Sequence, residues 1–169
     1  MGLILGTGVG GGIVVKGRAL NGLHGIAGEW GHNPLMGESR PCYCGRKGCI
    51  ETVLAGPSLE RFHRESGGEP LRLPDIVRAA SSGEKTAVAT LERLRDKFGE
   101  AIAAAINVLD PDAIVIGGGV GNIDLLYSEE TRRAIERFLF SGALSAHILR
   151  LRLGDSAGVF GAAMLTKTP

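Results

Sequence analysis

The apolar positions near the N-terminus form short runs separated by glycine, a pattern that predicts strands and turns rather than helices. Gly2–Leu5 is apolar and predicts a first strand, and residues 12–16 (GIVVK) contain a β-branched pair that predicts a second. Between them lies the run GTGVGGG, from Gly6 to Gly12, which we expect to form the turn of a β-hairpin with exposed backbone N–H groups. Residues 17–31 contain too much glycine for a regular helix and predict a loop.

Helical periodicity dominates the middle of the chain. Pro57 stands in the first turn of the segment PSLERFHRES, where its missing N–H costs little, and two glycines end that helix. The segment LPDIVRAASSG predicts a second, shorter helix. A long helix is predicted over residues 84–109, because large apolar residues recur there at steps of three or four. They form one apolar stripe: Leu91, Leu94, Phe98, Ile102, Ile106 and Leu109.

The last third of the chain alternates again between strand and helix patterns. Residues 113–116 (AIVI) predict a buried strand, which the glycines 117–119 follow directly. We expect a helix over 123–140, a strand over 147–153 and a final helix over 158–166. Strands that alternate with crossover helices predict the α/β class. We find no repeat or linker that would divide the chain, so residues 1–169 are predicted to form a single domain.

Composition and charge exclude several classes of function. The chain has 169 residues and a formal net charge of +1, so it lacks the basic surface typical of nucleic-acid binding. No apolar run approaches the roughly 20 residues of a membrane span, and the glycine-rich N-terminus lacks the basic region of a secretory signal. Three cysteines form an odd set, which argues against a disulfide framework and for metal binding in a reducing cytoplasm.

All three cysteines and one histidine lie in a single short stretch with the spacing H-x9-C-x-C-x4-C. The four residues are His32, Cys42, Cys44 and Cys49. They are a complete set of soft ligands for a tetrahedral zinc ion, and because protein fills all four positions the site would be structural rather than catalytic. The alternative is that the cysteines are simply buried or free. Glycines between the ligands would let the chain fold tightly around the metal.

Glycine makes up 27 of the 169 residues, about twice its usual share of roughly 7%, and it is clustered. In the first cluster, backbone N–H groups and the Thr7 hydroxyl could hold nucleotide phosphates. The residues expected to do so are Gly6, Thr7, Gly8, Gly10 and Gly11. In the second cluster, Gly117, Gly118 and Gly119 would let an adenine or ribose lie against the backbone. The alternatives are a plain hairpin turn and close packing of a helix on a strand.

Two acids bracket the cysteine stretch, and their carboxylates could accept hydrogen bonds from sugar hydroxyls. They are Glu29 and Glu51, and His32 could offer its second ring nitrogen to the same ligand while the first binds zinc. Helix caps or solvent-exposed acids explain the two glutamates equally well. We interpret the other histidines as surface or packing residues: His24, His63 and His147. Asp155, in the turn GDSAG, is at least as well explained as a helix cap as by a functional role.

Together these motifs resemble the ROK family of repressors, open reading frames and sugar kinases. The run GTGVGGG is similar to the family's phosphate loop, and the run from Glu29 to His32 matches its E-x-G-H element. The segment from Cys42 to Glu51 matches C-x-C-G-x-x-G-C-x-E. DPD followed by three glycines resembles the adenosine-side segment, and GDSAGVFGAA resembles the C-terminal helix. The strings AGEWGHNPL and PCYCGRKGCIET look most similar to bacterial fructokinases.

The resemblance implies a lobe of an actin-like (ribonuclease H-like) ATPase fold with a mixed sheet, flanking helices and a zinc-binding loop. It also implies an ATP-dependent hexose kinase, with fructose favoured over glucose and N-acetylhexosamines. Sugar would contact Glu29, His32 and Glu51, and Mg-ATP would lie against the two glycine clusters. The chemistry would be transfer of the γ-phosphoryl group to a sugar hydroxyl, achieved mostly by positioning and charge neutralisation.

One departure from the family pattern determines what the chain is expected to do. In the family, the aspartate that acts as general base lies in an N-terminal lobe, ahead of the phosphate loop. Here that loop begins at Gly6, so we expect the chain to be the C-terminal lobe alone, and we assign no catalytic residue within it. The resemblance therefore predicts that the chain has no kinase activity by itself.

Two other functions compete with this prediction. ROK repressors share the zinc element, so a sugar-sensing transcriptional regulator is the second candidate, and a zinc-stabilised interaction module without a sugar site is the third. The E-x-G-H element and the phosphate glycines favour the kinase, because a sensor has no need to hold ATP. C-terminal lobes of this family usually pair, so the resemblance also implies a homodimer.

Overall fold

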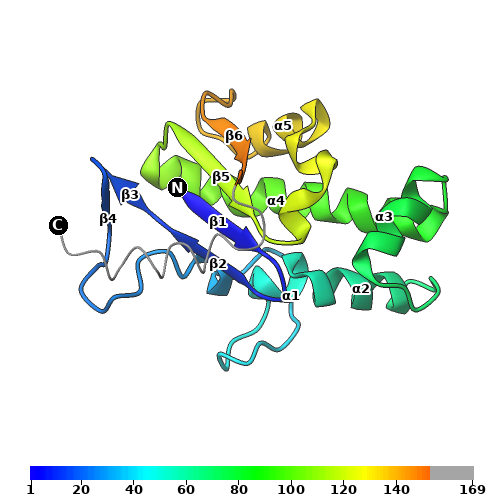
Figure 1. Cartoon of the computed structure of the whole chain (residues 1–169). Helices are drawn as coiled ribbons and strands as arrows, with labels where there is room; N and C mark the ends of the chain where they lie inside the picture. The colour runs from blue at the N-terminus through cyan, green and yellow to red at the C-terminus, as the bar shows by residue number, and fades with distance from the viewer. Residues whose placement is uncertain (153–169) are drawn as a thin grey trace.

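The computed structural model describes residues 1–152, and within them the strands form one four-stranded mixed sheet beside a separate two-stranded pair (Figure 1). The larger sheet has the order β2-β1-β5-β6. Its strands are β1 (Gly2–Leu5), β2 (Val9–Gly12), β5 (Ala113–Gly117) and β6 (His147–Arg150). Strand β1 pairs antiparallel with β2 and parallel with β5, and β5 pairs parallel with β6. The α/β class with a mixed sheet is confirmed, and three of its strands lie where the apolar pattern predicts.

The second strand differs from the prediction. The chain turns within Gly6–Gly8 and pairs again from Val9, so most of the run expected to be a turn belongs to β2. Packing explains glycine in this strand, because a Cβ at Gly11 would lie 2.9 Å from Cδ1 of Trp30. The predicted strand over 12–16 was therefore wrong in its bounds. Its residues divide between the end of β2 and the short β3 (Val14–Val15), which pairs with β4 (Arg18–Ala19).

Helices occupy the middle of the chain, as the periodicity predicts. They are α1 (Glu51–Leu54), α2 (Gly56–Glu65), α3 (Leu73–Ser81) and α4 (Lys85–Leu109). Figure 1 shows α4 running along the sheet, and one hydrophobic cluster joins its apolar stripe to buried side chains of β1 and β5. Phe98 and Ile102 of α4 are fully buried in that cluster. The helix begins at a Glu84 cap and ends at Asp110, which has a left-handed φ of 43°.

The helix expected over 123–140 is interrupted. The segment forms a 3-10 turn, η3 (Asp124–Tyr127), followed by α5 (Glu129–Glu136). Ser128 separates them because its backbone is extended and its hydroxyl accepts a hydrogen bond from the N–H of Thr131 at 3.2 Å, the geometry of a helix cap. The chain then leaves the helix well before residue 140. Helix α5 packs on α4, where a Cβ at Gly99 would lie 2.7 Å from the carbonyl oxygen of Ala134.

Two predictions fall outside the described residues: the final helix over 158–166 and the cap or functional role of Asp155. Among the other histidines, His63 is the packing residue, since it is 1% exposed and lies within 3.5 Å of the Thr90 hydroxyl. His24 and His147 are exposed. None of the helices in residues 1–152 is both long and apolar enough to cross a bilayer.

Candidate functional site

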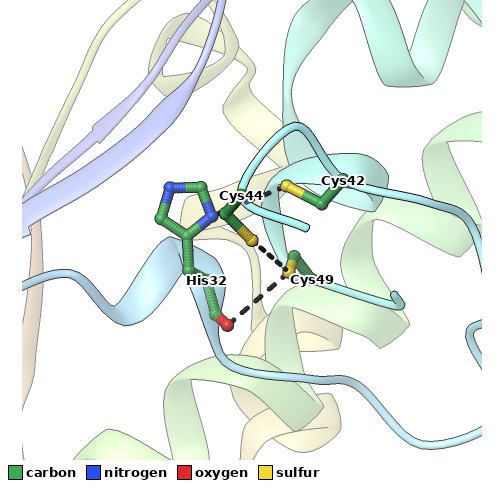
Figure 2. Close-up of side chains that lie close together, drawn as sticks. All are labelled: His32, Cys42, Cys44 and Cys49. Atoms are coloured by element: carbon green, nitrogen blue, oxygen red, sulfur yellow. Dashed lines mark hydrogen bonds between the residues drawn. The ribbon is translucent and has the colours of Figure 1, made fainter. Parts of the chain in front are cut away.

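The four predicted metal ligands lie together. The ligand atoms of His32, Cys42, Cys44 and Cys49 all lie within 4.8 Å of one another (Figure 2). Nδ1 of His32 is 3.6 Å from Sγ of Cys42, and the Sγ atoms of Cys44 and Cys49 are 3.6 Å apart. A tetrahedral zinc ion with Zn–S bonds of about 2.3 Å holds its sulfurs about 3.8 Å apart, so a small contraction of this cluster would let it hold zinc.

Backbone pairing brings the distant histidine to the cysteines. Leu35 donates to the carbonyl of Gly48 at 2.9 Å, and Ile50 donates to the carbonyl of Asn33 at 2.9 Å, so the chain after His32 runs beside the chain around Cys49. Gly48 has a left-handed φ of 71°, and a Cβ there would overlap the carbonyl of Glu38. Only glycine meets both conditions, which explains why this position between the ligands carries no side chain.

The thiols differ in their electrostatic surroundings. Burial, reinforced by the neighbouring thiols, raises the pKa of Cys49 to about 12. The pKa of Cys44 is lowered, mainly by a hydrogen bond from the backbone of Arg46. A buried thiol with a raised pKa keeps its proton unless a cation stabilises the thiolate, and a divalent metal supplies that charge. The donor set, in which Cys49 is buried and Cys44 exposed, therefore suits a structural zinc site with all four ligands supplied by protein.

The second ring nitrogen of His32 faces away from the cysteines and toward two other side chains. Nε2 lies 3.0 Å from the hydroxyl oxygen of Tyr43 and 3.9 Å from Oε2 of Glu29. The His32 and Tyr43 rings meet edge to face, with centroids 5.2 Å apart. The structure thus places Glu29 near His32, and it adds Tyr43, which sequence reasoning missed. Its position between Cys42 and Cys44 is the one sequence feature that could have indicated that Tyr43 lies near His32.

Glu51 points toward the glycine loop rather than to solvent. Its Oε2 accepts a hydrogen bond from the backbone N–H of Val9 at 2.9 Å, and a Cβ at Gly8 would lie 2.7 Å from the same oxygen. The Glu51 carboxylate is also the largest of the influences that raise the pKa of Tyr43, ahead of burial. A cavity of about 190 Å³ joins these groups, and its lining includes Thr7, Tyr43, Glu51 and two arginines, Arg40 and Arg61.

The residues expected to bind phosphate occupy two different environments. Gly6, Thr7 and Gly8 form the loop, in which Gly6 donates to the carbonyl of Gly8 at 2.9 Å. Gly10 and Gly11 lie instead in β2, where they pair with Ile4 and Leu3 of β1. The carbonyl of Gly10 also accepts a hydrogen bond from the indole of Trp30 at 3.1 Å. Within the loop, the N–H of Gly6 is therefore already paired, and the N–H groups of Thr7 and Gly8 are the ones left to meet a phosphate.

The second glycine cluster lies beside the first. Gly117 ends β5 next to Ile4 of β1, and because these strands are parallel, the loops that follow them leave the same edge of the sheet. Gly118 has a φ of 84°, and a Cβ there would overlap the carbonyl of Leu5. A Cβ at Gly117 would lie 2.5 Å from Cδ2 of Leu151, so close packing is found at two of the three glycines, and Gly119 has no atom within 4 Å of an added Cβ. The shared edge is where open α/β sheets place their ligands.

Comparisons with known proteins identify the family of the chain. The ROK family model matches residues 1–169. An N-acetyl-D-glucosamine kinase of Vibrio cholerae is 39% identical over 175 residues, covering 98% of this chain and 58% of the relative, so the chain spans less than two thirds of that protein.

Solved structures show the same likeness. A ROK family glucokinase from Streptomyces griseus, in complex with glucose and AMPPNP, matches with a TM-score of 0.84 at 29% identity, over 97% of this chain and 59% of that one. A ROK hexokinase from Thermus thermophilus matches with a TM-score of 0.85 at 34% identity, over 96% of this chain and 55% of the hexokinase. A ROK family transcriptional regulator, a homologue of the E. coli MLC protein, matches with a TM-score of 0.70 at 30% identity. The match covers 88% of this chain and 40% of the regulator.

Proposed function

This chain belongs to the ROK family, and from that premise we propose that it is the C-terminal lobe of an ATP-dependent hexose kinase whose preferred sugar is N-acetyl-D-glucosamine. The observation that carries the proposal is the position of Glu51. This acid follows the metal ligand Cys49 by two residues, and its carboxylate contacts the N–H that follows the glycine loop. A group suited to hold a sugar hydroxyl therefore lies directly beside a loop suited to hold phosphate.

The proposed roles follow from the chemistry of each group. Glu29 and Glu51 accept hydrogen bonds from sugar hydroxyls, since ionised carboxylates can only accept. The N–H groups of Thr7 and Gly8 and the Thr7 hydroxyl hold phosphates, since the N–H of Gly6 is already paired within the loop. The Gly117–Gly119 loop faces the adenosine. Zinc, when bound, holds the His32–Glu51 stretch in one conformation. The Mg²⁺ would arrive with the nucleotide, as in other phosphoryl-transfer enzymes.

The choice of sugar rests on the relatives. The Vibrio cholerae protein is named an N-acetyl-D-glucosamine kinase, and the Streptomyces griseus structure holds glucose. The fructokinase assignment suggested by the motif strings gains no support from these comparisons. N-acetyl-D-glucosamine therefore replaces fructose as the favoured substrate, with glucose second.

Turnover measurements test this proposal. We expect the 169-residue chain to show no ATP- and sugar-dependent turnover, because it contains no residue that we assign as general base. We propose that this chain is part of a longer protein. That protein should phosphorylate N-acetyl-D-glucosamine. Turnover by the chain alone would contradict the lobe assignment, and a longer protein that phosphorylates no sugar would contradict the kinase.

A sugar-sensing regulator is the second candidate, supported by the likeness to the ROK family transcriptional regulator. The two functions differ in what precedes this segment in the longer protein. A glycine-rich phosphate motif with a catalytic aspartate would support the kinase, and a helix-turn-helix would support the regulator. Specific binding of the longer protein to DNA would show that it is a regulator and not a kinase.

We also propose that this lobe pairs with a second copy of itself. Large apolar side chains are exposed around the end of α4, where Val108 is 83% and Phe140 is 99% exposed. Asn107 ties these segments together, because its side chain bonds to the backbone of both Phe138 and Phe140. A patch of this kind at a fixed position suits a protein interface. A monomer by light scattering at tens of micromolar would count against the pairing.

A further inference from the structure

Tyr43 is an exposed aromatic side chain on a fixed loop. Its side chain is 83% exposed, although the two neighbouring residues are both metal ligands. The backbone around it is closed by hydrogen bonds, since Cys42 donates to the carbonyl of Arg46 at 2.8 Å and Gly45 donates to the carbonyl of Cys42 at 3.0 Å. A rigid ring with a polar tip that faces solvent is well suited to contact a ligand.

The hydrogen bond between Tyr43 and His32 has a defined direction once His32 serves as a ligand. Nδ1 of His32 faces Sγ of Cys42, so this nitrogen carries the lone pair that a cation would use. The hydrogen then resides on Nε2, which lies 3.0 Å from the Tyr43 hydroxyl oxygen. Tyr43 therefore accepts this bond, and its own O–H hydrogen remains available to donate to another group.

The surroundings of that hydroxyl are the groups already proposed to bind sugar. Tyr43 and Glu51 line the same cavity as Thr7 of the glycine loop, and Glu29 approaches the His32 nitrogen that contacts Tyr43. Both carboxylates can only accept hydrogen bonds. The Nε2–H of His32 is already directed at Tyr43. The phenol therefore adds a donor beside two acceptors, which suits a sugar because its oxygens both donate and accept.

We propose that Tyr43 is a further sugar-contacting residue, whose hydroxyl accepts a hydrogen bond from Nε2–H of His32 and donates one to an oxygen of the bound hexose. This inference rests on the proposed hexose-binding function. It assigns Tyr43 a direct contact with the ligand beside Glu29 and Glu51, while the Nε2–H of His32, expected from the sequence to meet the sugar, is directed at Tyr43 instead.

The test compares Tyr43→Phe with the unmodified 169-residue chain by saturation-transfer NMR titration with N-acetyl-D-glucosamine and with glucose. The variant keeps the ring and loses only the hydroxyl, so sugar affinity should fall about 5- to 10-fold, the effect of one hydrogen bond. Zinc content and thermal stability should not change. Lys47→Ala is the matched control, because Lys47 is exposed in the same loop and is not a metal ligand. It should leave sugar affinity unchanged.

Each other outcome overturns the inference in a different way. Unchanged sugar affinity in Tyr43→Phe would show that the hydroxyl does not contact the sugar, while leaving the hexose-binding function intact. Loss of zinc together with sugar affinity would show that Tyr43 acts only through the metal loop. An unmodified chain that binds neither sugar would contradict the proposed sugar site itself, and the Tyr43 contact with it.

Discussion

The carboxylate of Glu51 accepts a hydrogen bond from the backbone N–H of Val9 at 2.9 Å, joining the end of the cysteine stretch to the start of β2. Glu51 begins α1 two residues after Cys49, so its position depends on the fold of the metal loop. Val9 follows the Gly6–Gly8 loop directly. The candidate metal site, the proposed sugar contact and the proposed phosphate loop are therefore coupled through one side chain, and a change in any of them should affect the others.

The Gly8→Ala substitution should displace that carboxylate. The added Cβ would lie 2.7 Å from Oε2 of Glu51, a separation that two atoms cannot keep, and the side chain is the part able to move. We expect the affinity for N-acetyl-D-glucosamine to fall about tenfold, equivalent to about 1.4 kcal/mol, with the fold retained. Saturation-transfer titration measures the affinity, and thermal unfolding measures the stability.

Gly12→Ala is the control for this substitution. Gly12 lies in the same hairpin, has no atom within 4 Å of an added Cβ, and does not have a left-handed φ. Sugar affinity should be unchanged in this variant. Equal affinities of the two variants would show that the contact between Gly8 and Glu51 does not shape the site.

Removal of zinc should loosen the cysteine loop and weaken sugar binding together. Metal analysis of the purified chain should find one zinc per chain, and Cys49→Ser should remove it, because Cys49 is the buried ligand. Structural zinc stabilises small peptides by about 10 kcal/mol or more, so even a part of that energy would lower the melting temperature clearly. A purified chain without zinc, or a Cys49→Ser variant with unchanged sugar affinity, would contradict this coupling.

Gly99→Ala tests the packing of α4 on α5. Where space is free, replacing glycine by alanine within a helix stabilises it by about 1 kcal/mol. Here the added Cβ would lie 2.7 Å from the carbonyl oxygen of Ala134, so we expect destabilisation by about 1–3 kcal/mol from overpacking. Denaturant unfolding gives the sign directly, and a more stable variant would show that the two helices are not in such close contact.

The Glu84 cap of α4 should make stability depend on pH in a defined direction. The N–H groups of Thr86 and Ala87 donate to its carboxylate and hold its pKa below the usual 4.5. The cap therefore stabilises the folded chain at pH values above the ordinary pKa, and this contribution is lost as the pH falls through the lowered value. Glu84→Gln should melt lower than the unmodified chain near neutral pH, and the difference should shrink in acid.

Glu92→Gln is the control for this effect. Glu92 is exposed on the same helix and lies outside its first turn, so its replacement should leave the melting temperature nearly unchanged at every pH. A difference between Glu84→Gln and the unmodified chain that stays constant with pH would contradict the cap.

Local chemistry made part of the structure predictable. The cluster of His32, Cys42, Cys44 and Cys49 could be predicted because all four potential ligands lie in one short stretch, and few sites other than a metal site need three cysteines and a histidine at this spacing. Helix α4 followed from its apolar stripe. The start of β2 could not be predicted, because glycine normally indicates a turn. Here Gly11 is needed for the approach of Trp30, a residue 19 positions later, and such a contact leaves no local pattern.

The sequence pattern indicates neither the break at Ser128 nor the proposed role of Tyr43, for related reasons. Ser128 lies within a helical pattern, and only its bond to Thr131 shows that a new helix begins there. Nothing in the spacing of the candidate ligands singles out Tyr43, which lies between two of them. Its importance depends on the orientation of the His32 ring, which is set when the chain folds and not by spacing.

The most direct measurement of the central claim is a comparison of kcat/KM for N-acetyl-D-glucosamine, glucose and fructose in the longer protein that contains this chain. We predict ATP-dependent phosphorylation with N-acetyl-D-glucosamine as the best substrate and a severe loss of kcat/KM in Glu51→Gln. Absence of turnover with all three sugars, or turnover that Glu51→Gln leaves unchanged, would contradict it.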